Sequence, residues 1–341
     1  MIPPPRWDFE PDMRPSAPAA DPSAQPKPGW VSTKWKLLCV AVTIVALYLV
    51  FRRIHIATLL HILGSMHVGW FIGAMILYGI MFLPAAFRWH LALHVNDAVI
   101  SPPATLAFSI IGHFFYLLLF GGAGGDAAKA TVYGRRYKLP IPRTLTSVSL
   151  DRLMGSGALI VVAIIAFAIT GTHGGFAETK SLSINKSAWL LLLLIPVIIT
   201  ALILLKRSHH ESIFRRFAVA FLEGGNRLIR SPKIVLKGFF CSLLMQLAIN
   251  VSLAMNLQAV SHTPLPWLKL VWAFPLITAI SGLPVTVAGI GARDGAAIAL
   301  LGWCGIAAAD AEAMSLLALC VTVFWGLVGG IVLWRESSRA K

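Results

Sequence analysis

Long apolar runs, separated by polar connections, dominate the chain between residues 35 and 334. A helix that crosses a bilayer needs roughly 20 consecutive apolar residues. We therefore expect about six full spans in an all-α polytopic membrane protein. The runs of spanning length are 35–51, 69–87, 145–170, 188–205, 238–260 and 315–334.

Two further apolar segments, 104–120 and 271–288, each lead into a stretch that is rich in glycine and carries charges. These stretches are 120–130 and 284–297, and together with the spans they give about eight hydropathy peaks. Glycine lets the backbone bend, and Pro284 interrupts a helix. Broken backbone is tolerated at membrane depth only where protein or a water-filled cavity shelters it. The pattern predicts two broken or re-entrant helical hairpins.

The composition agrees with a membrane protein, because 57% of the 341 residues are hydrophobic and only 13% are charged. Soluble domains carry about twice that charged fraction. The net charge of +15 lies mainly between apolar runs, which is typical of topology signals and of attraction to anionic lipids. No basic and aromatic surface for nucleic acid is visible, and the four cysteines form no pairing or metal motif.

Three regions of the chain follow from these patterns. Residues 1–29 are rich in proline, and we expect a disordered cytoplasmic tail there. Residues 30–335 form a single transmembrane domain, and residues 336–341 form a short basic cytoplasmic tail. Within the domain, residues 54–66 suit a helix lying in the membrane interface, and 88–90 suit an interfacial group of a cation and aromatic rings.

Charge placement also predicts the orientation. The basic segments 126–143 and 206–237, the second interpreted as a loop, are expected in the cytoplasm with both termini. This placement requires 104–138 to enter and leave from the cytoplasm and 271–306 to enter from the outside. The two halves then have opposite topology, as in the inverted repeats of many transporters. We treat the inverted repeat as a hypothesis.

The two glycine-rich stretches carry the candidate site. Open helix ends expose N–H groups and partial positive charge, and a cation beside them can receive a phosphate-bearing head group. We expect Lys129 and Arg293 to contact the head group and Asp126 and Asp294 to be their partners in the empty site. The glycines that allow close backbone approach are Gly124, Gly125, Gly289 and Gly291, and a further charge pair is Asp151 and Arg152. In the structural alternative, the glycines only pack helices and the charges only pair.

These motifs resemble a known family. The run Gly124-Gly125-Asp126 followed by Lys129, the pair at 151–152 and the run 289–295 are similar to the lysylphosphatidylglycerol synthase transmembrane region family, whose members are also called flippase-like. The resemblance covers roughly residues 35–335. The family usually has proline where Phe120 stands and arginine where Lys129 stands, and often glutamate at 294. The lysine brings bidentate binding at 129 into question.

The resemblance implies a membrane domain that moves lipids or lipid-linked precursors between leaflets. Its best-known members add a soluble aminoacyl-transferring domain, which we do not expect in this chain. We therefore expect a lipid flippase or transporter for an anionic phospholipid or a polyprenyl-phosphate-linked precursor, in the inner membrane of a bacterium. The alternative is a scaffold or accessory subunit of a lipid-modifying or glycosyl-transferring enzyme. No catalytic constellation, metal site or cofactor motif is visible, so we expect neither an enzyme nor a cofactor.

Overall fold

The computed structural model describes residues 62, 64–98, 101–118, 121–172, 211–261, 264–282 and 291–338. All regular elements in these ranges are α-helices, which confirms the predicted fold class. The expected spans 35–51 and 188–205, the N-terminal tail and most of the expected interfacial helix at 54–66 lie outside the described residues.

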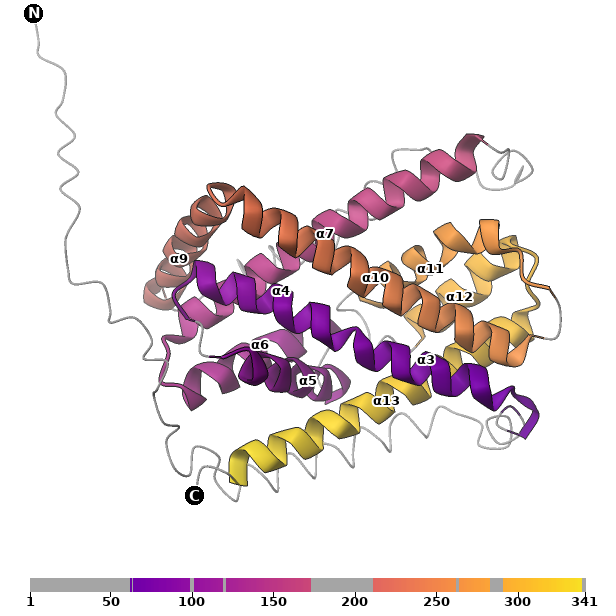
Figure 1. Cartoon of the computed structure of the whole chain (residues 1–341), viewed down its shortest axis with the longest axis horizontal. Coiled ribbons are helices and arrows are strands. Elements are labelled where there is room, and N and C mark those ends of the chain that lie inside the picture. The colour runs from indigo at the N-terminus through magenta and orange to yellow at the C-terminus, as the bar shows by residue number, and fades with distance from the viewer. Residues whose placement is uncertain are drawn as a thin grey trace, which may run out of the picture.

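Among the described residues, three long apolar segments are able to cross a membrane by length and composition: Val68–Val95, Pro232–Val260 and Ala308–Ser337. The first consists of helices α3 (Val68–Ile80) and α4 (Phe82–Val95), which follow each other with a joint at Met81. The other two are α10 (Pro232–Val260) and α13 (Ala308–Ser338). They run across the whole molecule in Figure 1, with α7 (Ile141–Thr172) crossing behind.

The first broken segment is a hairpin of two helices, α5 (Pro102–Leu118) and α6 (Gly121–Arg136). Helix α5 has 17 residues. At 1.5 Å per residue it is about 25 Å long, which is less than a hydrocarbon core of about 30 Å. Near the end of α6, the Tyr133 hydroxyl donates to the Ala98 carbonyl at 3.3 Å. The hairpin therefore returns to the end of the bundle where it began, as expected for a re-entrant element.

The second broken segment is also a hairpin, made of α11 (Trp267–Ser281) and α12 (Ala292–Trp303). The Cys304 thiol, directly after α12, lies 3.5 Å from the Lys269 carbonyl in the first turn of α11. The two ends of this hairpin therefore also meet.

The two hairpins open towards opposite ends of the bundle (Figure 1). At one end, Arg227 pairs with Asp97 at 2.7 Å and Arg136 pairs with Glu336 at 3.2 Å. At the other end, the His67 amide donates to the Ala259 carbonyl at 2.8 Å, beside the connection that leads into α11. The opposed hairpins have the geometry that an inverted repeat requires; the repeat itself stays a prediction.

Each hairpin contributes to its own apolar core. One core includes Trp89, Phe108 and Tyr133, from α4, α5 and α6. The other includes Phe274 and Leu301, from α11 and α12. Because side chains from several helices interlock in each core, the charged residues at the hairpin tips are held in a packed frame.

The described part of the basic segment 206–237, residues 211–237, is helical and not a loop, contrary to the prediction. Residues Glu211–Ile229 form helix α9, and α10 begins at Pro232. This segment forms a helix because it has an apolar face, which is hard to recognise among the many cations in the sequence. Phe221, Gly224 and Leu228 recur at helical spacing and face the bundle. The opposite face leaves Leu222 and Ile229 exposed.

Candidate functional site

The glycine-rich stretch at 120–130 is helical from Gly121 onward. The backbone at Gly124 and Gly125 therefore lies inside a helix and is not open. Gly125 is instead a contact point between α6 and α5. A Cβ atom there would lie 2.8 Å from the Gly112 carbonyl oxygen and 2.9 Å from the Tyr116 amide nitrogen. Because both neighbours are backbone atoms, only glycine allows the two helices to come this close.

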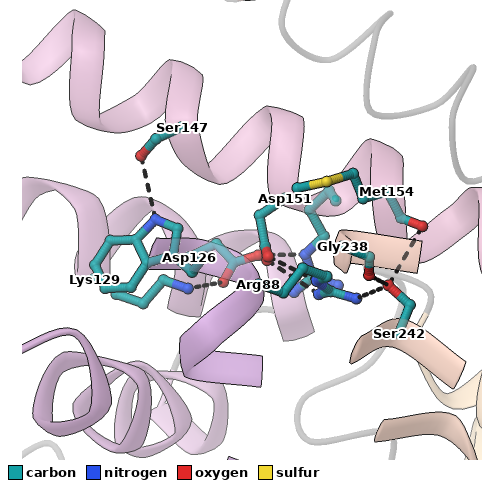
Figure 2. Close-up of polar contacts among 10 residues, drawn as sticks. Arg88, Asp126, Lys129, Ser147, Asp151, Met154, Gly238 and Ser242 are labelled. Carbon is teal, nitrogen blue, oxygen red and sulfur yellow. Dashed lines mark hydrogen bonds and ion pairs between the residues drawn. The ribbon is translucent and has the colours of Figure 1, made fainter. Parts of the chain in front are cut away.

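Asp126 lies in the next position and binds two cations. Its carboxylate accepts a hydrogen bond from Arg152 Nε, and its other oxygen lies 3.5 Å from Lys129 Nζ. Figure 2 shows the Asp126–Lys129 pair beside α7, which carries Arg152. The Asp126 carboxylate thus forms ion pairs with one cation on its own helix and one cation on α7.

Lys129 faces the inside of the bundle and is only 6% exposed. Its Nζ lies 4.2 Å from the centre of the Trp89 ring, and the Trp89 indole N–H donates to Ser147 at 3.2 Å. Its aliphatic stem packs on Gly112. A cation–π contact and an ion pair therefore hold the ammonium in place. A head-group contact for Lys129 stays a prediction, and the packing favours a structural role.

Arg152 is the accessible cation of this cluster, because its side chain is 53% exposed. A Cβ atom at Gly122 would lie 2.5 Å from its guanidinium, so this glycine leaves the room in which the group lies. Asp151 and Arg152 do not pair with each other as the sequence suggested. Arg152 turns to Asp126, and Asp151 turns to a partner on α4.

That partner is Arg88, which donates to both oxygens of Asp151 at 2.7 and 3.1 Å and to Ser242 at 2.9 Å (Figure 2). Arg88 and Asp151 are each 5% exposed. A Cβ atom at Gly155 would lie 2.7 Å from the Arg88 guanidinium. The ion pair therefore joins α4, α7 and α10 inside the bundle.

The expected interfacial group at 88–90 is thus wrong for Arg88 and Trp89, which are buried among helices. The sequence after this group carried the signal: the helix continues through the apolar Leu91, Ala92 and Leu93, so the arginine does not mark its end. A charge inside an apolar helix predicts an inward-facing partner.

The second cluster begins at Gly291, whose φ of 84° suits glycine and starts α12. The Gly291 amide donates to Asp294 at 2.9 Å, so this carboxylate caps the helix. Asp294 also accepts from the Ser315 hydroxyl, which itself accepts from Arg293 Nε at 2.9 Å. Gly289 lies outside the described residues.

Arg293 keeps one donor unused. The residue is 6% exposed, and Nη2 has no hydrogen-bond partner among the described residues; Asp294 Oδ1 lies 3.8 Å from it. A buried donor without a partner costs free energy, so it marks a strained structure or the place of a ligand. The structure thus brings Arg293 and Asp294 together, as expected, through Ser315.

The charged side chains of the two clusters are groups that can bind an anion. Arginine guanidinium groups match phosphate oxygens in geometry and charge. Among the described residues, no group of three or more His, Cys, Asp or Glu side chains is arranged to hold a metal ion. The chemistry that these residues support is the binding of an anion within a helical membrane domain.

The fold defines a polytopic α-helical membrane protein with buried charge clusters beside its two hairpins. The family model described as "Lysylphosphatidylglycerol synthase TM region" matches residues 36–330. The chain belongs to this family, as the sequence motifs predicted, and is therefore a membrane protein of lipid metabolism or transport. A search of curated proteins found no match.

Proposed function

We propose that this protein is a lipid flippase, which binds the head group of an anionic phospholipid or a polyprenyl-phosphate-linked precursor and helps it cross the bilayer. The observation that carries the proposal is one arginine beside each hairpin: Arg152 on α7, next to Gly122 of the first hairpin, and Arg293 in the first turn of α12. Arg152 is accessible while its neighbours are buried, and Arg293 keeps an unpartnered donor. Guanidinium groups at membrane depth are costly and are typical of substrate pathways.

The ion pairs suggest how a head group enters. A phosphate that takes over Arg152 releases Asp126 from it, and Lys129 remains 3.5 Å from that carboxylate to balance its charge. The exchange leaves no isolated buried carboxylate, which keeps its cost low. We propose no covalent step and no resident cofactor, and any active transport draws on an ion gradient or a partner protein.

We further propose that the protein lies in the inner membrane of a bacterium with both termini in the cytoplasm. The basic α9 and Asp97, which are joined by the Arg227–Asp97 pair, then face the cytoplasm. A membrane-impermeant thiol reagent tests the orientation in a cysteine-free background. Asp97→Cys should react only from the cytoplasmic side, and Ala307→Cys, in the turn before α13, only from the outside. Labelling of Asp97→Cys from the outside would refute this orientation.

Lipid identification by mass spectrometry tests the proposed function. We expect one anionic lipid class to copurify with the wild type and to be depleted at least tenfold in Arg152→Gln and Arg293→Ala, because loss of a desolvated charged hydrogen bond weakens binding by that order. Arg335→Gln is the matched control, since Arg335 is an exposed arginine at the far end of α13. Lys129→Ala tests the remaining predicted contact.

The lipid content of the variants distinguishes a lipid-binding role of Arg152 and Arg293 from a role in packing alone. Loss of the lipid from folded, monodisperse Arg152 and Arg293 variants supports the proposal, and movement of that lipid in proteoliposomes is then the direct assay. If the wild type and all variants carry the same bulk lipid mixture, the proposed binding site is refuted.

The second candidate function is a scaffold or accessory subunit of a lipid-modifying or glycosyl-transferring enzyme. It is favoured by the surface at the α9–α10 corner, where exposed apolar and basic side chains alternate. The exposed residues are Leu222, Ile229, Arg230, Lys233, Leu236 and Lys237. If this function is right, removing these charges impairs the cell more than Arg152→Gln or Arg293→Ala does.

A further inference from the structure

Helix α9 lies across the end of the bundle, where α4 ends and α10 begins (Figure 1). The Arg227 guanidinium donates to the Val95 carbonyl at 3.3 Å and to Asp97 at 2.7 Å. A Cβ atom at Gly224 would lie 2.7 Å from the Asn96 side-chain oxygen, so α9 comes close to the end of α4. These contacts fix which face of α9 points towards the bundle and which points away from it.

This helix carries apolar side chains on two faces. Phe221 and Leu228 pack on the core of the bundle. Leu222 and Ile229 each follow by one position, so they lie about 100° further around the helix, and they are 71% and 79% exposed. Glu223, one position further again, is exposed on the next flank. Helix α9 therefore has a bundle face, an exposed apolar face and a charged face.

The exposed apolar face lies at the level where a membrane span begins. Helix α10 is able to cross a membrane, and its first residue, Pro232, comes three positions after Ile229. Leu236, in the second turn of α10, is 70% exposed and continues the apolar surface. A span starts where the hydrocarbon core of the bilayer starts, so Ile229 lies close to the acyl chains. The apolar face is therefore within reach of lipid and does not need to lie in water.

Cations border this apolar surface. Arg230, Lys233 and Lys237 are exposed and lie next to Ile229 and Leu236 along the chain. Lysine and arginine beside exposed apolar side chains are typical of a helix that lies in the membrane interface and attracts anionic lipid. A protein partner could match the charges, but the short connection to a span favours lipid as the group that covers the apolar side chains.

We propose that the exposed face of α9, with Leu222 and Ile229, is immersed in the membrane leaflet at this end of the bundle and binds anionic lipids there. Arg230, Lys233 and Lys237 contact the lipid phosphates. The inference assigns the α9–α10 corner to a lipid surface, where the second candidate function has a partner enzyme. It concerns a surface outside the two charged clusters and does not rest on lipid transport.

Spin-label accessibility tests the immersion. The full chain in a cysteine-free background carries a nitroxide at Leu222→Cys or Ile229→Cys, in nanodiscs of phosphatidylcholine and phosphatidylglycerol. Glu223→Cys, on the neighbouring flank, is the matched control. The labels at 222 and 229 should collide several-fold less often with a water-soluble nickel chelate than the label at 223, and more often with oxygen, which concentrates among acyl chains. Equal access of the chelate to all three labels would refute the immersion and leave a protein partner as the occupant.

Lipid selectivity tests the role of the cations. Spin-labelled phosphatidylglycerol should associate with the wild type more strongly than spin-labelled phosphatidylcholine, and Arg230→Gln/Lys233→Gln/Lys237→Gln should lose most of this preference. The control Lys269→Gln/Arg335→Gln removes two exposed cations elsewhere and should keep it. An unchanged preference in the triple variant would overturn the binding of anionic lipid at this corner. Because the two charged clusters are unaltered in that variant, the proposed flippase function would still stand.

Discussion

Replacing Arg88 with alanine is expected to lower the free energy of unfolding by about 3–5 kcal/mol, the cost of leaving one partner of a buried ion pair alone. Asp151 is 5% exposed, and Arg88 is its bidentate partner. Without the guanidinium, Asp151 is left as a carboxylate in a dry environment, and Ser242 loses a donor. The Arg88 cavity beside Gly155 adds to the loss.

Thermal unfolding in detergent, followed by the fraction of protein that stays monodisperse, measures this effect. The double variant Arg88→Met/Asp151→Leu should recover most of the lost stability, because apolar residues of similar size replace buried ion pairs well. Arg335→Ala, at an exposed arginine, should change stability by less than about 0.5 kcal/mol. Equal stability of Arg88→Ala and the wild type would show that Arg88 and Asp151 do not form the buried pair.

The three spans that the structure describes and the two hairpins could be predicted, because membrane insertion leaves a strong one-dimensional pattern. Apolar runs set helix lengths, and the charged glycine-rich stretches mark where the chain turns back. The pairing of Arg293 with Asp294 could also be predicted, because both residues lie in the first turn of α12. A carboxylate that caps a helix three residues after a glycine is a local feature of the sequence.

The partners across helices could not be predicted from spacing. Asp151 and Arg152 are adjacent in sequence, but successive residues on a helix point about 100° apart, so they meet different neighbours. Which neighbours these are depends on how α4, α6 and α7 pack, and Arg88 lies 63 residues away from Asp151 along the chain. The bridging role of Ser315 between Arg293 and Asp294 depends likewise on the position of α13.

The helix at Glu211–Ile229 was missed for a different reason. Its cations suggested a solvated loop, yet charges on one face are what an amphipathic helix at an interface carries. At the site, too, the sequence motif did not show which side chain is exposed. Lys129 lies in the more recognisable motif, but Arg152 is the more exposed cation of the first cluster.

Asp126→Ala is expected to destabilise the protein by a similar amount, about 3–5 kcal/mol, because it leaves the Lys129 ammonium buried. Among the described residues, the Trp89 face then remains beside this ammonium, and a cation–π contact contributes about 2 kcal/mol at a desolvated site. Arg152 also loses its partner, but its accessible guanidinium can be hydrated. Removing Lys129 as well, in Asp126→Ala/Lys129→Met, should therefore restore most of the stability, as measured by thermal unfolding in detergent.

The same double variant decides which cation contacts the lipid. If Lys129 only holds Asp126, the folded double variant keeps anionic lipid binding within a few fold of the wild type, because Arg152 and Arg293 remain. If Lys129 is a head-group contact, as the sequence motif suggested, binding falls by about tenfold or more although stability returns. Arg152→Gln, measured beside it, should show the opposite pattern: lost binding with a smaller change in stability, because Lys129 stays beside Asp126 and keeps that carboxylate paired.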